Sequence, residues 1–234
     1  MAKIFIDPGH GGSDPGAVGN GLREKDLTLD ISKRIKKYLD DNFTGHIIRM
    51  SRTGDTTLSL TQRANSANSW GADILVSVHI NAGRGTGYED YIFNGNVSSK
   101  TINIRNTIHA EISKELGNVR NRGKKRANFA VLRQTKMPAI LTENLFIDTK
   151  ADADKLKSNA YLNRIAKGHA EGIAKAFNLK PKSKPVPKPT PKPSSNTFYR
   201  VVAGSYNDRK NADNQVNKLK KLGVDGVFID VFKK

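Results

Sequence analysis

The feature of this sequence that most constrains its fold is the alternation of short apolar runs with stretches of helical periodicity. Runs typical of strands occupy residues 4–6, 46–50, 72–79, 88–93 and 138–146. Apolar residues recur at helical spacing in residues 27–39, 60–70, 98–116 and 151–178. Strands that alternate with helices predict an α/β fold, with a mostly parallel twisted sheet and helices on both of its faces.

Two segments within this region have weaker patterns. Residues 120–126 contain five cationic side chains and are predicted to form a basic, solvated loop; a rim that faces the substrate is the alternative. Residues 129–132 are apolar enough for a short strand.

The C-terminal part has a different composition. Residues 180–196 are rich in proline and lysine, which favours an extended linker over a packed core. Residues 197–234 then show a strand pattern at 198–206, a helical pattern at 211–222 and a second strand pattern at 227–231. We therefore expect a first domain over 1–179, a linker over 180–196 and a small βαβ module over 197–234.

Composition limits the chemistry that the chain can perform. The sequence contains no cysteine, so disulfides, thiolate metal sites and a cysteine nucleophile are excluded. Any transition metal must be held by histidine and carboxylate groups.

The net charge of +18 points to a polyanionic partner. Anionic cell-wall polymers fit this charge, whereas the chain shows no zinc-finger or RNP pattern that would support nucleic acid. No apolar run is long enough for a membrane span, and the first residues lack the order of a signal peptide. We expect no membrane insertion, and synthesis in the cytoplasm.

Two histidines follow apolar strands and stand beside glycines. His10 follows the first strand within a glycine-rich stretch, and His79 ends the clearest buried strand of the chain. Ligands of open α/β sheets bind at the carboxyl ends of strands. A glycine-rich turn with an incidental histidine would explain either position alone, but the repetition favours a metal site.

Two carboxylates are placed where they could join these histidines. Glu24 stands at the mouth of the first helix, where favourable interaction with the helix dipole is the simpler explanation. Glu143 interrupts an apolar strand, which is costly unless the carboxylate is paired or lies near a metal. Because parallel strands end at one edge of the sheet, His10, Glu24, His79 and Glu143 are expected to converge there. His46, His109 and His169 have no such position and are interpreted as structural.

The residues of these motifs resemble those of the zinc-dependent N-acetylmuramoyl-L-alanine amidases of the Amidase_3 family. The resemblance covers about residues 1–178 and is carried by the segments 6–12, 51–53, 77–82 and 142–144, together with Glu24, Leu60 and Arg63. It implies that His10, Glu24 and His79 are zinc ligands, that Glu143 is the catalytic carboxylate, and that Asn81 and Arg63 contact the substrate.

The C-terminal segment is similar to SPOR domains, which bind peptidoglycan, through residues 199–206, 211–213 and 222–225. Only one of the two βαβ halves of such a domain is present, so pairing between chains into a homodimer is expected. The alternative is a half that packs on its own catalytic domain or stays loosely ordered. The combination is similar to phage endolysins and to sporulation-type wall hydrolases, released through a holin or by mother-cell lysis.

The implied activity is hydrolysis of the amide between N-acetylmuramic acid and L-alanine in peptidoglycan, which lyses the cell wall. A zinc carboxypeptidase or endopeptidase acting on the stem peptide is the alternative within the hydrolases. A protein that only binds cell wall or nucleic acid is the alternative outside them, and it would tolerate loss of His10, Glu24 and His79.

Overall fold

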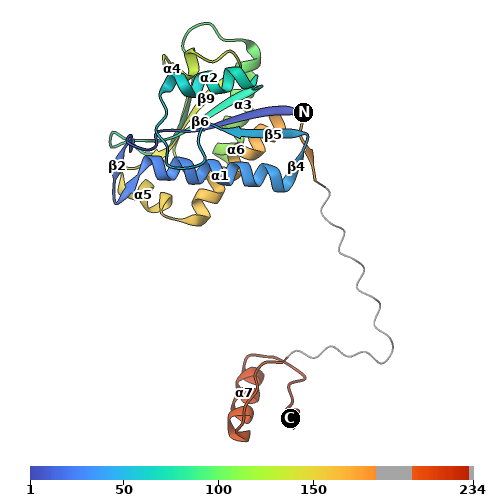
Figure 1. Ribbon diagram of the computed structural model, residues 1–234. Helices are drawn as coiled ribbons and strands as arrows, with labels where there is room; N and C mark the ends of the chain where they lie inside the picture. The colour runs from blue at the N-terminus through green and yellow to red at the C-terminus, as the bar shows by residue number, and fades with distance from the viewer. Residues whose placement is uncertain (183–201, 232–234) are drawn as a thin grey trace. The chain divides into compact units, whose positions relative to one another are not determined.

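The computed structural model describes residues 1–182 and 202–231, and the chain divides into two compact units, Met1–Lys184 and Pro185–Lys234 (Figure 1). Each unit is described by itself below. No helix within the described residues is both long and apolar enough to cross a membrane.

A six-stranded sheet forms the centre of the first unit. Its strands, in spatial order, are β5 (His46–Met50), β1 (Ala2–Pro8), β6 (Ile74–Asn81), β9 (Ala139–Phe146), β7 (Tyr88–Phe93) and β8 (Asn121–Ala127). All neighbouring pairs are parallel except β7 and β9, which run antiparallel. The prediction of a mostly parallel sheet in an α/β fold is confirmed.

Helices cover both faces of this sheet (Figure 1). One face packs against α1 (Glu24–Asn42), α3 (Ser99–Leu116) and α6 (Asn159–Ala176), and the other packs against α2 (Leu60–Trp70) and α4 (Ala130–Arg133). Close packing of α6 on α3 depends on glycine, because a Cβ atom on Gly168 would lie 2.7 Å from the Ile112 Cα atom. The shorter elements are β2 (Val18–Gly19), β3 (Leu22–Arg23), β4 (Phe43–Thr44), α5 (Lys150–Leu156) and β10 (Lys180–Pro181).

The structure corrects three expectations about local structure. Residues 121–126 form most of the edge strand β8 rather than a loop, because their backbone pairs with β7 while their charged side chains remain partly exposed. Residues 130–132 belong to the short helix α4, in which Val131 and Leu132 are buried, and Phe129 is its N-cap residue, so no strand forms there. The single helix expected over 151–178 is two helices, α5 and α6, separated at Lys157 and Ser158.

The second unit contains the helix α7 (Arg209–Lys221), which agrees with the helix expected near 211–222. Asp208 caps this helix, since its carboxylate accepts a hydrogen bond from the Lys210 backbone N–H. Within the described part of the chain, residues 202–206 and 227–231 are not assigned to the two strands expected on either side of α7. The rest of the first of these strands, residues 198–201, lies outside the described residues.

The first residues of the expected linker belong to the first unit. Lys180 and Pro181 pair antiparallel with β4, and the Lys182 backbone N–H donates to the Asn42 carbonyl. Residues 183–196 of the expected linker lie outside the described residues.

Candidate functional site

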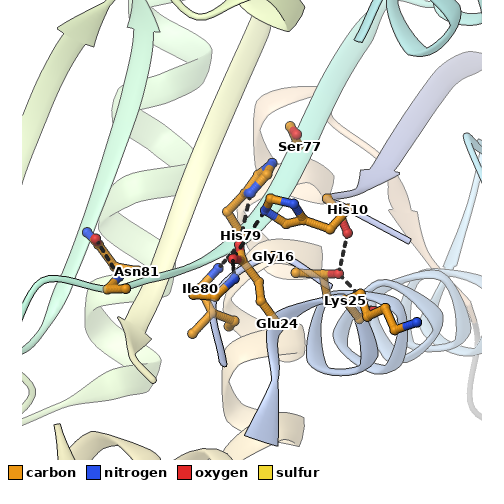
Figure 2. A network of polar contacts seen from close by, with 12 residues as sticks. His10, Gly16, Glu24, Lys25, Ser77, His79, Ile80 and Asn81 are labelled. Atoms are coloured by element: carbon orange, nitrogen blue, oxygen red, sulfur yellow. Dashed lines mark hydrogen bonds and ion pairs between the residues drawn. The ribbon is translucent and has the colours of Figure 1, made fainter. Parts of the chain in front are cut away.

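Three of the predicted site residues meet at the carboxyl ends of β1 and β6. His10 follows β1, His79 lies in β6, and Glu24 is the first residue of α1. The Glu24 carboxylate lies between the two rings, 3.1 Å from His10 Nε2 and 3.0 Å from His79 Nδ1 (Figure 2). Their potential ligand atoms all lie within 4.8 Å of one another, so the three residues form a possible metal site.

Glu24 is held in place by backbone groups as well as by the histidines. It is 4% exposed, and its two carboxylate oxygens accept hydrogen bonds from the N–H groups of Ala17 and Ile80. Burial alone would raise the pKa of Glu24, but the hydrogen bonds and charges of His10 and His79 outweigh it and hold that pKa well below its usual range. The ionised carboxylate is therefore the form that this environment favours.

His10 is oriented from both sides of its ring. Its Nδ1 atom lies 2.8 Å from the Asp14 carboxylate, while its Nε2 atom faces Glu24. Burial lowers the pKa of His10, but Glu24 and Asp14 together raise it to about 9. A carboxylate behind a histidine fixes the tautomer and the ring orientation that a metal ligand needs.

Two glycines allow the groups of the site to approach one another. A Cβ atom on Gly9 would lie 2.3 Å from the Cε1 atom of His79. A Cβ atom on Gly16 would lie 2.7 Å from a carboxylate oxygen of Glu24, and the φ angle of Gly16 is +63°. Both positions therefore require glycine, because any side chain would displace a group of the site.

Arg63 lies buried beneath the loop that carries His10. It is 3% exposed and donates to the Asp7 carboxylate at 2.8 Å and to the carbonyls of Pro8 and His10 at 2.6 Å. The bond to His10 stabilises a backbone conformation that is costly for residues other than glycine, since the φ angle of His10 is +60°. These bonds give Arg63 a role in shaping the loop, and its contact with the substrate stays a prediction.

Glu143 lies on the strand next to His79. The pairing register of β6 with β9 places His79 opposite Glu143, and cross-strand partners share one face of a sheet. One carboxylate oxygen of Glu143, Oε2, is buried and has no hydrogen-bond partner among the described residues. Burial raises the pKa of Glu143 to about 7, against the opposing charge of His79. Such a group can exchange a proton near neutral pH.

Asn81 points away from the cluster of His10, Glu24 and His79 (Figure 2). Its side-chain amide donates to the Glu89 carboxylate at 2.8 Å, and Glu89 is the cross-strand partner of Glu143 on β7. Glu89 and Asp14 were both missed by the sequence reasoning. Asp14 could have been found from its position four residues after His10 in the sequence. Nothing in the sequence of β7 indicated a role for Glu89.

The other three histidines lie outside this cluster and have structural partners. His46 Nε2 lies 3.1 Å from Asp40, His109 Nδ1 lies 2.6 Å from Asp90, and His169 Nδ1 lies 2.8 Å from the Ile165 carbonyl. Burial lowers the pKa of His169 to about 4, so this side chain is neutral at physiological pH.

Removal of the charge behind His10 provides a test of metal binding at this cluster. We expect Asp14→Asn to weaken zinc affinity by about 10-fold or more, because second-layer partners of metal ligands contribute about 10–100-fold. Asparagine can still accept the hydrogen bond that the Gly16 N–H donates to Asp14, so the turn is preserved. Competition with a zinc-binding dye measures the affinity.

Asp41→Asn is the matched control, because Asp41 pairs with Lys37 near the far end of α1. Equal zinc affinity in the Asp14 variant and the control would show that the Asp14–His10 contact does not support metal binding.

Two protein families match the chain. The family described as N-acetylmuramoyl-L-alanine amidase matches residues 4–175, and the SPOR domain family matches residues 147–230. The two matches overlap at residues 147–175, which include α5 and most of α6 of the first unit.

Similar proteins include enzymes from a bacterium and from a phage. The sporulation-specific N-acetylmuramoyl-L-alanine amidase of Bacillus subtilis is 46% identical over 229 residues, which cover 98% of this chain and 85% of the relative. The endolysin of Bacillus phage SPP1 is 45% identical over 188 residues, covering 78% of this chain and 69% of the relative. The crystal structure of an N-acetylmuramoyl-L-alanine amidase from Clostridium difficile 630 aligns with a TM-score of 0.72 at 36% identity, covering 76% of this chain and 97% of that chain.

Proposed function

Because the chain belongs to the N-acetylmuramoyl-L-alanine amidase family, which hydrolyses an amide bond of peptidoglycan, we propose that His10, Glu24 and His79 bind its zinc ion and that Glu143 is its general base. The observation that carries this proposal is the convergence of three potential ligand atoms within 4.8 Å, one strand away from Glu143, whose Oε2 atom is buried.

The donor set suits zinc. Two imidazole nitrogens and one carboxylate oxygen are the protein ligands of one known class of catalytic zinc site, and they leave a fourth position open. The chain has no cysteine that could complete a closed structural site in its place. Bound zinc would polarise the scissile carbonyl and lower the pKa of a water molecule.

Glu143 would move the proton that the reaction requires. In the hydrolysis, water adds to the carbonyl carbon of the lactyl group and the bond to the L-alanine nitrogen breaks. The Glu143 carboxylate would take one proton from the attacking water and deliver it to the leaving nitrogen. Its unpartnered Oε2 atom and its raised pKa, about 7, support both halves of this transfer.

Metal analysis combined with mass spectrometry of digested peptidoglycan tests the proposal. We expect about one zinc per chain, loss of activity on chelation, and recovery when zinc is added. The products should be peptide-free glycan and intact stem peptides. Shortened stem peptides on intact glycan would instead indicate the alternative, a carboxypeptidase or endopeptidase, and full activity without metal would exclude the zinc proposal.

The SPOR domain gives the chain a second means of reaching its substrate, since such domains bind peptidoglycan. Binding to anionic wall polymers, which the charge of +18 suggests, stays a prediction. Homodimer formation through the C-terminal module and release by a holin or by mother-cell lysis also stay predictions.

A further inference from the structure

The edge strand β8 brings cationic side chains close to the proposed general base. Glu143 on β9 pairs with Glu89 on β7, and β7 pairs in turn with β8. From β8, Arg122 and Lys125 both reach the Oε2 atom of Glu89. Adjacent strands lie about 4.8 Å apart, so this cationic pair is roughly one strand spacing from Glu143.

Glu89 is ionised and surrounded by donors. It is 2% exposed, and its Oε1 atom accepts hydrogen bonds from Asn81 and Tyr91. Burial raises the pKa of Glu89, but the bonds from Lys125, Arg122 and Tyr91 outweigh this and lower it to about 2. Two cations share this one carboxylate, so one unit of positive charge at this place is not balanced by Glu89.

Arg122 is held rigidly, and part of its guanidinium group is still free. Its Nε atom donates to Glu89 at 2.7 Å, and its guanidinium carbon lies 4.9 Å from the centre of the Phe146 ring. The side chain is 25% exposed, and within residues 1–182 and 202–231 its Nη1 and Nη2 atoms have no hydrogen-bond partner. A guanidinium fork fixed in this way is suited to a planar anion such as a carboxylate.

We propose that Arg122, assisted by Lys125, binds a carboxylate on the stem-peptide residue that follows L-alanine. The proposal rests on the proposed function, because it takes Glu143 to mark the scissile bond. One extended residue spans about 3.5 Å, which is comparable with the single strand spacing between Glu143 and Glu89. A substrate whose amide is at Glu143 and whose stem peptide runs across β7 towards β8 would bring its next residue to Arg122.

A phosphate-bearing wall polymer is the competing anion for these cations. The position of the two cations favours the peptide carboxylate. Arg122 and Lys125 both bond Glu89, and Glu89 is the cross-strand partner of Glu143 on β9. A polymer that only attracts the protein to the wall would have no need for a fork fixed beside the general base.

The test uses two synthetic N-acetylmuramoyl tripeptides that differ at the residue after L-alanine, one with a free carboxylate and one with a carboxamide. The zinc-loaded full chain is compared with Arg122→Gln, Arg122→Lys and Lys124→Gln. The readout is the ratio of kcat/KM for the two substrates, because a general disturbance of the site affects both substrates alike.

We expect the unmodified protein to prefer the carboxylate substrate by about 10-fold or more, the size of a lost charge-assisted hydrogen bond. Arg122→Gln should bring the ratio close to one, and Arg122→Lys should retain part of it. Lys124→Gln is the control, because it removes the same charge from the same strand. It should keep the full ratio, because the Lys124 side chain contacts Asn106 of α3.

Equal cleavage of both substrates by the unmodified protein, or an unchanged ratio in Arg122→Gln, would overturn this subsite while the amidase function stood. Cleavage of neither substrate at the lactyl amide would overturn the proposed function and the subsite together. A ratio that stays unchanged in Arg122→Gln, with slower lysis confined to walls that carry phosphate polymers, would assign Arg122 to polymer binding and reject the carboxylate subsite.

Discussion

Replacing Glu143 with glutamine should slow turnover by roughly 10²-fold or more while the protein keeps its zinc. Glutamine preserves the shape of the side chain, but it cannot take a proton from water. Glu143 lies on β9, whereas the three proposed ligands lie at the ends of β1 and β6 and at the start of α1, so the metal site is left intact. Steady-state rates on purified peptidoglycan, with zinc content measured on the same sample, give both quantities.

Glu111→Gln is the matched control for this substitution. Glu111 lies on α3 and pairs with Lys175, so its change removes the same charge far from the strand ends. We expect the control to keep normal turnover. Near-normal turnover in Glu143→Gln would assign the proton transfer to another group, and loss of its zinc would make Glu143 part of the metal site.

His79→Ala should lose both zinc and activity. The substitution removes one of three proposed ligands and leaves Glu24 with a single imidazole partner, His10. Activity should fall by about 10³-fold or more, since the protein groups would then act without the metal. Metal analysis after dialysis should show far less than one zinc per chain.

His46→Ala controls for the loss of an imidazole. His46 stands at the start of the edge strand β5 and bonds Asp40, so its replacement removes a ring without touching the cluster. The control should retain zinc and activity. A His79→Ala protein that still held one zinc and full activity would show that the ligand set is wrong.

The approach of His10, Glu24 and His79 to one another followed from local patterns and one rule of topology. The apolar runs that became β1 and β6 have high strand propensity, and both are buried in the structure. Parallel neighbours end at the same edge of a sheet, so residues 69 positions apart in the sequence, His10 and His79, come together in one possible metal site. Burial of the apolar residues was sufficient to determine this placement.

Elements without an apolar pattern could not be identified in this way. The backbone of β8 is a strand because β7 offers it hydrogen-bond partners, and its cationic side chains carry no signal of that pairing. The break between α5 and α6 was also missed, because the apolar spacing continues across Lys157 and Ser158.

The sequence by itself determined the class of fold, the strands that carry the site, and the residue types able to hold a metal. Only the tertiary structure decided which charged groups stay partly exposed and which lie buried beneath the loop. Arg63 and Arg122 are both arginines near conspicuous segments, yet one is buried against Asp7 and the other presents its fork beside Glu89. That difference depends on contacts between segments far apart in the chain, and the energy of such contacts is absent from any local pattern of residues.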